Sequence, residues 1–229
     1  MIKQLTKQRR TVMEKDFAKV SEKALKIYQD LTIQRDTVQS ATLAALLGKE
    51  IDACLRMMNA YNDYAELCQK RYIESIDRRT KDLNDAIANA KSIPDPVKQI
   101  QYLDHAKIVH EQRADRERID EIAYERSTDI YLTVLSRDFK DWDAFAIKAG
   151  KAVVESAASL TPVISTGQFI VDCVRKFSEL RKEFNDNGTD YSETDKQLLI
   201  IEIHTQMAEK TTEMLLQGIN NNNNSNDVA

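Results

Sequence analysis

The chain has 229 residues, of which 42% are hydrophobic and 31% charged, so it is long enough to bury one large core or two small ones. Five glycines and three prolines are too few for the turns of a many-stranded sheet, and a formal charge of −4 excludes electrostatic attraction of the whole chain to nucleic acid. The three cysteines are an odd number within apolar faces, which argues against a disulfide scaffold. These features predict an all-α protein, an elongated bundle of about five or six long amphipathic helices with coiled-coil character.

Residues 1–93 are predicted to form a long-helix coiled-coil segment, because apolar residues recur there at alternating spacings of three and four. Gln34 is an exception within this seam. The seam changes frame after Gly48, where we favour a turn between two helices, although a stutter in one continuous coil would produce the same shift. The residues of the first seam that we expect to mediate association are Phe17, Val20, Ile27, Leu31 and Val38.

Pro94 and Pro96 mark a boundary, because each disfavours helix at the residue before it and lacks a backbone donor. We expect Asp95 to cap the next helix and Pro96 to occupy its first position. The connection is short, which favours two helices that fold back on each other. Residues 94–219 are predicted to form a C-terminal helical bundle.

Residues 144–174 differ in character, since small and apolar residues replace the long charged ones. Thr161 and Pro162 read as a cap and a first helical residue, so this segment is predicted to be an apolar helical hairpin. One interpretation is the buried centre of a bundle, where small residues let helices approach closely. The other is conditional membrane insertion, through Val153, Val154, Val163, Ile164, Phe169 and Ile170.

The C-terminal region carries two local signals. Asn185 to Gly188 is typical of a helix-terminating turn, and Ser192 with Asp195 resembles a capping box, although Glu or Gln is the usual partner. A last amphipathic helix follows. Residues 220–229 begin with an asparagine run that offers no apolar side chain, so they are predicted to be a disordered tail.

Patterns that would indicate catalysis or metal binding are incomplete. His110–Glu111 begins like a metalloprotease helix, but Ala114 stands where the second histidine must lie. Residues 183–194 approach a calcium-binding loop but lack its first aspartate and its final glutamate. No phosphate loop or nucleophile turn is present. We therefore predict no enzyme, and no catalytic, cofactor-binding or metal-binding residues.

Long charged helices with an apolar hairpin between the later ones resemble, in layout, α-helical pore-forming toxins of the cytolysin A type. The resemblance implies membrane insertion through the hairpin. From the residues we expect instead a non-enzymatic helical-bundle protein, an assembly or scaffold component that acts through protein–protein association. The expected partner is a second copy, forming a homo-oligomer, or another helical protein; no nucleic acid is expected, and membrane contact would be conditional. No standard signal peptide is recognised, so we expect a cytoplasmic protein or one released by another route.

Overall fold

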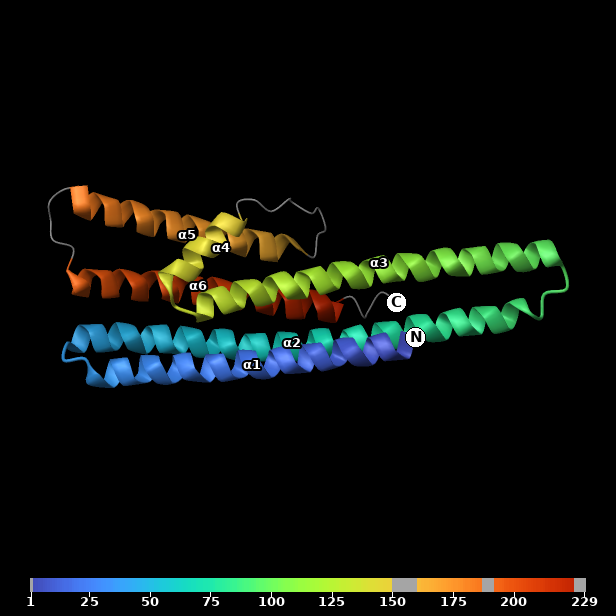
Figure 1. The fold of residues 1–229 in the computed structure, drawn as a ribbon, viewed down its shortest axis with the longest axis horizontal. Coiled ribbons are helices and arrows are strands. Elements are labelled where there is room, and N and C mark those ends of the chain that lie inside the picture. The colour runs from blue at the N-terminus through green and yellow to red at the C-terminus, as the bar shows by residue number, and fades with distance from the viewer. Residues whose placement is uncertain (1, 150–159, 187–191, 225–229) are drawn as a thin grey trace. The chain divides into compact units, whose positions relative to one another are not determined.

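The computed structural model describes residues 2–149, 160–186 and 192–224, and its regular elements there are six α-helices with no strand (Figure 1). This confirms the predicted all-α class and packed helical bundle. The helices are α1 (Ile2–Thr37), α2 (Ala41–Ala90), α3 (Pro96–Leu135), α4 (Phe139–Ala149), α5 (Thr161–Asp186) and α6 (Glu193–Asn224).

The first break in the chain lies at residues 38–40, so the predicted turn at Gly48 is wrong. Ser40 caps α2, because its hydroxyl accepts the Leu43 amide at 3.4 Å and its carbonyl accepts the Ala44 amide at 2.9 Å. Gly48 lies inside α2 instead. A helix tolerates one internal glycine at a cost of about 1 kcal/mol, so its presence did not require a turn.

The predicted boundary near residue 95 is confirmed. α2 ends at Ala90 and α3 begins at Pro96, with an Asp95 carboxylate oxygen accepting the Val97 amide at 2.9 Å. The two helices fold back on each other, as Figure 1 shows, and Ser75 reaches Glu117 while Asp82 reaches Arg113. The later residue on α2, Asp82, contacts the earlier residue on α3, Arg113, so the two helices run in opposite directions, as in an antiparallel hairpin.

The capping of the last helix is also confirmed. The Ser192 hydroxyl accepts the Asp195 amide at 3.1 Å, while an Asp195 carboxylate oxygen accepts the Ser192 amide at 3.3 Å. These reciprocal bonds form a capping box in which aspartate replaces the usual glutamate. α6 then extends to Asn224, past residue 220, where the disordered tail was predicted to begin.

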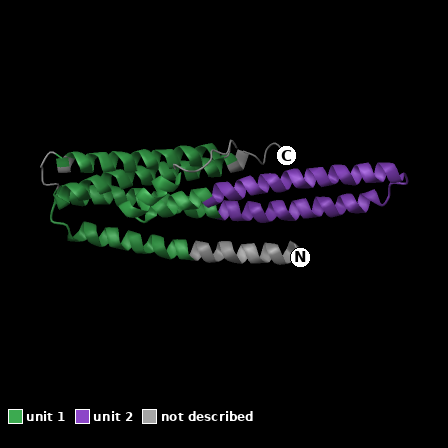
Figure 2. Ribbon diagram, turned by 45° about the horizontal axis from the view of Figure 1, so that its top comes forward, with its two compact units in different colours: residues 1–65, 126–229 green, residues 66–125 purple. Residues whose placement is uncertain are grey.

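The chain forms two compact units, and one of them combines two separate stretches of the sequence (Figure 2). Unit 1 comprises residues 1–65 and 126–229, and unit 2 comprises residues 66–125. The predicted boundary at residues 93 and 94 falls inside unit 2, at the turn of its helical hairpin. α2 and α3 contribute to both units because each is long.

The main core lies in unit 1. Tyr61 on α2 stacks on Tyr131 on α3, with ring centroids 3.9 Å apart and ring planes 3° from parallel. α5 packs against both α4 and α6, and its buried face includes Val163, Ile170 and Phe177. Burial of large aromatic and aliphatic side chains supplies most of the favourable free energy of such a fold.

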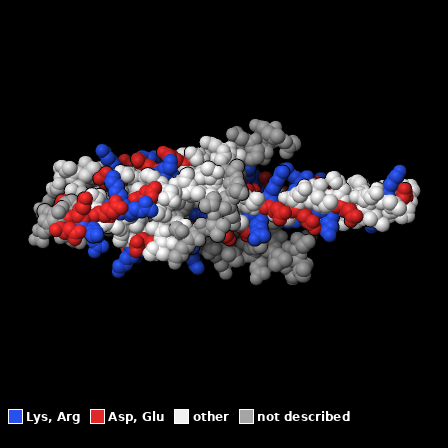
Figure 3. Space-filling model, turned by 90° about the horizontal axis from the view of Figure 1, so that it is seen from above, with Lys and Arg blue, Asp and Glu red and all other residues white. Residues whose placement is uncertain are grey.

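Among the described residues, no helix combines the length and apolar character that a membrane crossing requires. On the face drawn in Figure 3, acidic and basic side chains are interspersed rather than separated into single-sign patches. This distribution agrees with the small net charge.

Candidate functional site

Three charged side chains from distant parts of the chain meet inside unit 1. Glu50 on α2 is fully buried, and the Arg137 guanidinium donates to both of its carboxylate oxygens, from Nε at 2.6 Å and from Nη2 at 3.1 Å. His204 on α6, also fully buried, places Nδ1 2.6 Å from Glu50 Oε1. We call Glu50, Arg137 and His204 the charge cluster.

The protonation state of His204 follows from its two hydrogen bonds. Nδ1 faces the Glu50 carboxylate, and Nε2 lies 2.8 Å from the carbonyl oxygen of Val134. Both partners can only accept, so both ring nitrogens must donate and the ring is an imidazolium. Burial alone lowers the pKa of His204, but Cys54 and Glu50 beside the ring outweigh it and raise the pKa to about 10.

The pKa of the Glu50 carboxyl is lowered, whereas that of His204 is raised. Burial alone raises the pKa of its carboxyl, but the hydrogen bonds and positive charges of His204 and Arg137 outweigh burial and hold the pKa below its ordinary value. The cluster therefore contains one carboxylate and two cations. A charged group that is this deeply buried is tolerated only when it is paired and hydrogen-bonded.

The backbone turn after α3 positions Arg137. Its φ is 53°, a left-handed conformation that a non-glycine residue adopts at a cost of roughly 1–3 kcal/mol. Its amide donates to the Val134 carbonyl at 3.2 Å, so this oxygen accepts from both Arg137 and His204. Arg137 Nη1 also reaches Gln34 Oε1 on α1 at 3.4 Å, which explains why a polar residue interrupts the apolar seam of α1.

Trp142 connects α4 to the cluster. Its side chain is fully buried, its ring lies 5.8 Å from the His204 ring at 18° from parallel, and its Nε1 donates to the Thr133 carbonyl at 3.1 Å. An aromatic face against a cation is favourable by about 0.5–2 kcal/mol. The charge cluster thus joins side chains or backbone of α1, α2, α3, α4 and α6.

Cys54, His204 and Glu50 are the residue types of a cysteine–histidine–carboxylate triad, but they do not have its geometry. Cys54 Sγ lies 3.9 Å from both ring nitrogens of His204, so the sulfur is not in line with either one. Both nitrogens are already occupied by Glu50 and the Val134 carbonyl, which leaves no base for a thiol. The cluster is therefore arranged to hold helices together rather than to activate Cys54.

The residues of the first seam that we predicted to mediate association are mainly buried or half-buried within the fold of the chain. Val20 and Leu31 are buried, Ile27 and Val38 are half-buried, and the side chain of Phe17 is outside the described residues. Of the hairpin residues, Val163 and Ile170 are buried and Ile164 and Phe169 half-buried, whereas Val153 and Val154 lie outside the described residues.

Exposed apolar side chains are found on α1, where Leu25 and Ile33 are 54% and 61% exposed, and on α3 in unit 2. Val97, Ile100 and Ile108 are 63%, 60% and 51% exposed. At about 100° per residue they fall within roughly 80° of one another around the helix. We call these three residues the α3 stripe. Its neighbours are exposed charges of both signs, including Lys107, which pairs with Glu111 at 3.9 Å.

No group of histidine, cysteine, aspartate or glutamate in the described part of the chain could hold a metal ion. No protein-family model, curated protein or solved structure matches the chain.

The charge cluster was not predicted from the sequence. Its one sequence signal was that Gln34, Glu50 and His204 each stand among apolar residues on a helical face. Periodicity marks such a residue as an exception but cannot name its partner.

Proposed function

We propose that this chain is a non-enzymatic helical-bundle protein that acts through association with another helical chain, in the simplest case a second copy of itself. The observation that supports the proposal is the α3 stripe, where three large aliphatic side chains lie more than half exposed on one side of a helix. Single exposed apolar residues are common, but a grouped set with a polar rim is typical of an interface.

The proposal includes the coiled-coil character expected of the long helices. A two-helix hairpin buries each helix on one side only, so a third helix from another chain could cover the α3 stripe. The charged neighbours Lys98 and Lys107 would remain at the edge of such a contact, where they can stay hydrated. Asp104 lies within the stripe, between Ile100 and Ile108, so its carboxylate would have to pair with a cation of the partner helix.

The experiment compares the solution mass of two variants by size-exclusion chromatography with light scattering. Ile100→Glu places a charge within the stripe, whereas Gln101→Glu adds the same charge at an adjacent exposed position. We expect the wild type and Gln101→Glu to form oligomers at high micromolar concentration and Ile100→Glu to have a lower mass. At a concentration low enough for all three proteins to be monomeric, circular dichroism should show the same melting temperature, because both sites are exposed.

A strictly monomeric wild type at that concentration would contradict self-association. Oligomers whose mass is unchanged by Ile100→Glu would remove the α3 stripe from the interface.

A second candidate function is conditional membrane insertion through the apolar hairpin expected at residues 144–174. It is supported by Ile147, which is 56% exposed on α4. Insertion would require α5 to release its buried face, which includes Val163 and Ile170, and to carry Lys148 and Asp172 toward the bilayer. Each such charge costs roughly 2.5–3.5 kcal/mol at the bilayer centre, so association remains the first proposal.

A further inference from the structure

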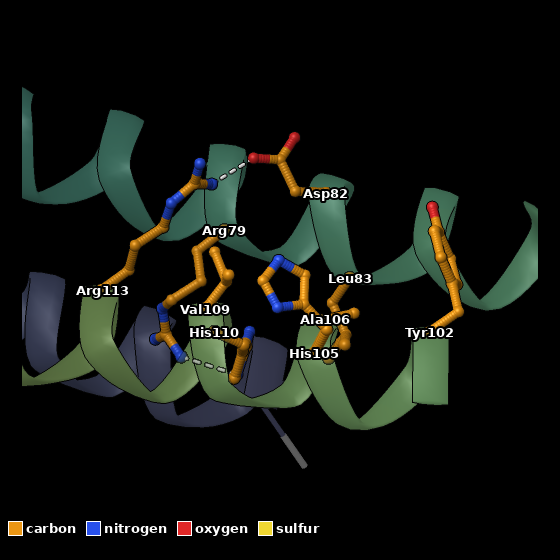
Figure 4. Close-up of a pocket in the computed structure, with 9 residues that line it drawn as sticks. All are labelled: Arg79, Asp82, Leu83, Tyr102, His105, Ala106, Val109, His110 and Arg113. Atoms are coloured by element: carbon orange, nitrogen blue, oxygen red, sulfur yellow. Dashed lines mark hydrogen bonds and ion pairs between the residues drawn. The ribbon is translucent and has the colours of Figure 1, made fainter. Parts of the chain in front are cut away.

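A groove between α2 and α3 within unit 2 has a cavity volume of about 160 Å³ (Figure 4). Leu83 on α2 and Ala106 and Val109 on α3 provide its apolar lining, and all three are half-buried. An apolar cavity of about 150 Å³ can hold a benzene molecule, so the groove has room for a branched aliphatic side chain. We call it the α2–α3 groove.

The α2–α3 groove and the α3 stripe lie on opposite sides of α3. At about 100° per residue, Ala106 and Val109 lie roughly 160° around the helix from the middle of the stripe. A twofold contact between two stripes would therefore leave the grooves of both copies open. A contact between the stripe of one copy and the groove of another covers both kinds of surface.

The stripe and the groove share a spacing along the helix. Each contains two apolar residues and one charged residue at intervals of three and four positions, namely Val97, Ile100 and Asp104 in the stripe and Ala106, Val109 and Arg113 along the groove. Two parallel α3 helices shifted by nine residues place the apolar residues of one series over those of the other. The acidic residue of the stripe then meets the basic residue of the groove.

Asp104 and Arg113 give this contact its charge complementarity. Asp104 is exposed, and burial of its carboxylate against a partner requires a cation. Arg113 lies toward one end of the groove, where it pairs with Asp82 while 43% of its side chain stays exposed (Figure 4). A guanidinium has five N–H donors, so Arg113 can donate to Asp82 and to a second carboxylate from another chain.

We propose that the α3 stripe of one copy packs into the α2–α3 groove of the next copy, with Asp104 of the first beside Arg113 of the second. This inference rests on the proposed self-association and specifies its geometry. Each copy carries one stripe and one groove on opposite sides of α3, so the contact repeats from copy to copy. Such a heterologous contact forms a closed ring or an open head-to-tail chain rather than a twofold dimer.

The test mixes two variants that each lack one side of the contact. Ile100→Glu places a charge in the stripe and leaves the groove intact, whereas Ala106→Glu fills the groove and leaves the stripe intact. By size-exclusion chromatography with light scattering at high micromolar concentration, we expect wild-type assemblies of more than two chains. Each variant alone should be monomeric. Their equimolar mixture should form a complex of two chains, because each such pair has one intact stripe and one intact groove.

Gln112→Glu is the matched control for the groove, because it adds the same charge at an exposed residue of α3 that does not line the groove. It should assemble like the wild type. Circular dichroism at a concentration low enough for monomers should show a folded helical protein for every variant, so that a lower mass is not caused by unfolding.

A charge exchange tests the predicted register. Asp104→Arg should weaken assembly about ten-fold, because it places a second cation beside Arg113 of the next copy. Addition of Arg113→Asp in the same chain should restore assembly, because the exchanged charges attract each other again. Sedimentation equilibrium of the single and double variants measures the change.

Four results would overturn the proposal. A mixture of the two folded variants that stays monomeric would show that stripe and groove do not bind each other, and failure of the charge exchange to restore assembly would refute the register. Wild-type assembly by Ala106→Glu, or a wild-type mass that stops at two chains, would exclude the groove but leave the stripe interface of the proposed function in place. A strictly monomeric wild type, by contrast, would refute the proposed self-association itself.

Discussion

His204 and Glu50 are 154 positions apart in the sequence, yet His204 Nδ1 lies 2.6 Å from Glu50 Oε1 inside unit 1. With Arg137 they place three charged groups where water does not reach Glu50 or His204. Such a cluster does not by itself make a protein more stable than an apolar core would. It makes the helices that carry it dependent on one another, because removing one partner leaves a buried charge unpaired.

Glu50→Gln should lower the free energy of unfolding by about 3–5 kcal/mol. The amide keeps the size of the side chain but removes the negative charge that compensates Arg137 and His204. Chemical denaturation followed by circular dichroism measures the change. The fluorescence of Trp142, the single tryptophan, reports whether the contact with His204 is altered.

Glu209→Gln is the matched control for this prediction. Glu209 pairs with Arg56 at 3.4 Å, and both side chains are more than half exposed, so we expect a change below about 1 kcal/mol. Equal effects of the two substitutions would show that the buried cluster has no special role.

The stability of the protein should fall as the pH rises from 6.5 to 10. The pKa of His204 is raised from its ordinary value of 6.5 to about 10 in the folded chain, so its contribution is fully present below pH 6.5. Between these values the unfolded state loses the proton first, and the free energy of unfolding decreases by up to about 1.4 kcal/mol per pH unit.

His204→Gln provides the control, because it cannot titrate. Its stability should be lower at neutral pH and should decrease less steeply between pH 6.5 and 10. Parallel pH profiles for the two proteins would contradict a protonated His204. The pKa of Glu50 is lowered, so its own contribution should be lost in the opposite direction, as the pH falls below 4.5.

Gly48→Ala and Gly218→Ala should change stability in opposite directions. A Cβ at Gly48 meets no atom within 4 Å, so alanine should stabilise α2 by about 0.5–1 kcal/mol. A Cβ at Gly218 would lie 2.7 Å from the ring of Tyr64, which is rigid and buried, and the clash should cost about 1–3 kcal/mol. Thermal melting of both variants tests the pair, and stabilisation by Gly218→Ala would show that Tyr64 moves freely.

Ile147→Asp and Ile170→Asp separate a structural hairpin from a membrane-inserting one. Ile170 is fully buried, so an unpaired carboxylate there should cost several kcal/mol, whereas Ile147 is exposed and its substitution should leave stability unchanged. For a structural hairpin we expect no dye leakage from lipid vesicles with any of the proteins. Leakage by the wild type that Ile147→Asp abolishes would favour membrane insertion over association.

Several helix ends could be predicted from the sequence because their causes are local. Asp95 accepts the amide of Val97 two residues later, and Ser192 and Asp195 satisfy each other across one helical turn. Such contacts depend on neighbouring residues and need no knowledge of the fold. The break at residues 38–40 was missed because Ser40 caps α2 without glycine or proline beside it.

The sequence by itself determined the helical class, through its composition and apolar periodicity, and it determined the α2–α3 turn through Pro94 and Pro96. Only the tertiary structure decided which polar residues on apolar faces belong together. Gln34, Glu50, Arg137 and His204 come from four separate stretches of chain, and each is compatible with many partners until the helices pack. Pairing of buried charges depends on distance in space, and helical periodicity carries information about distance along one helix only.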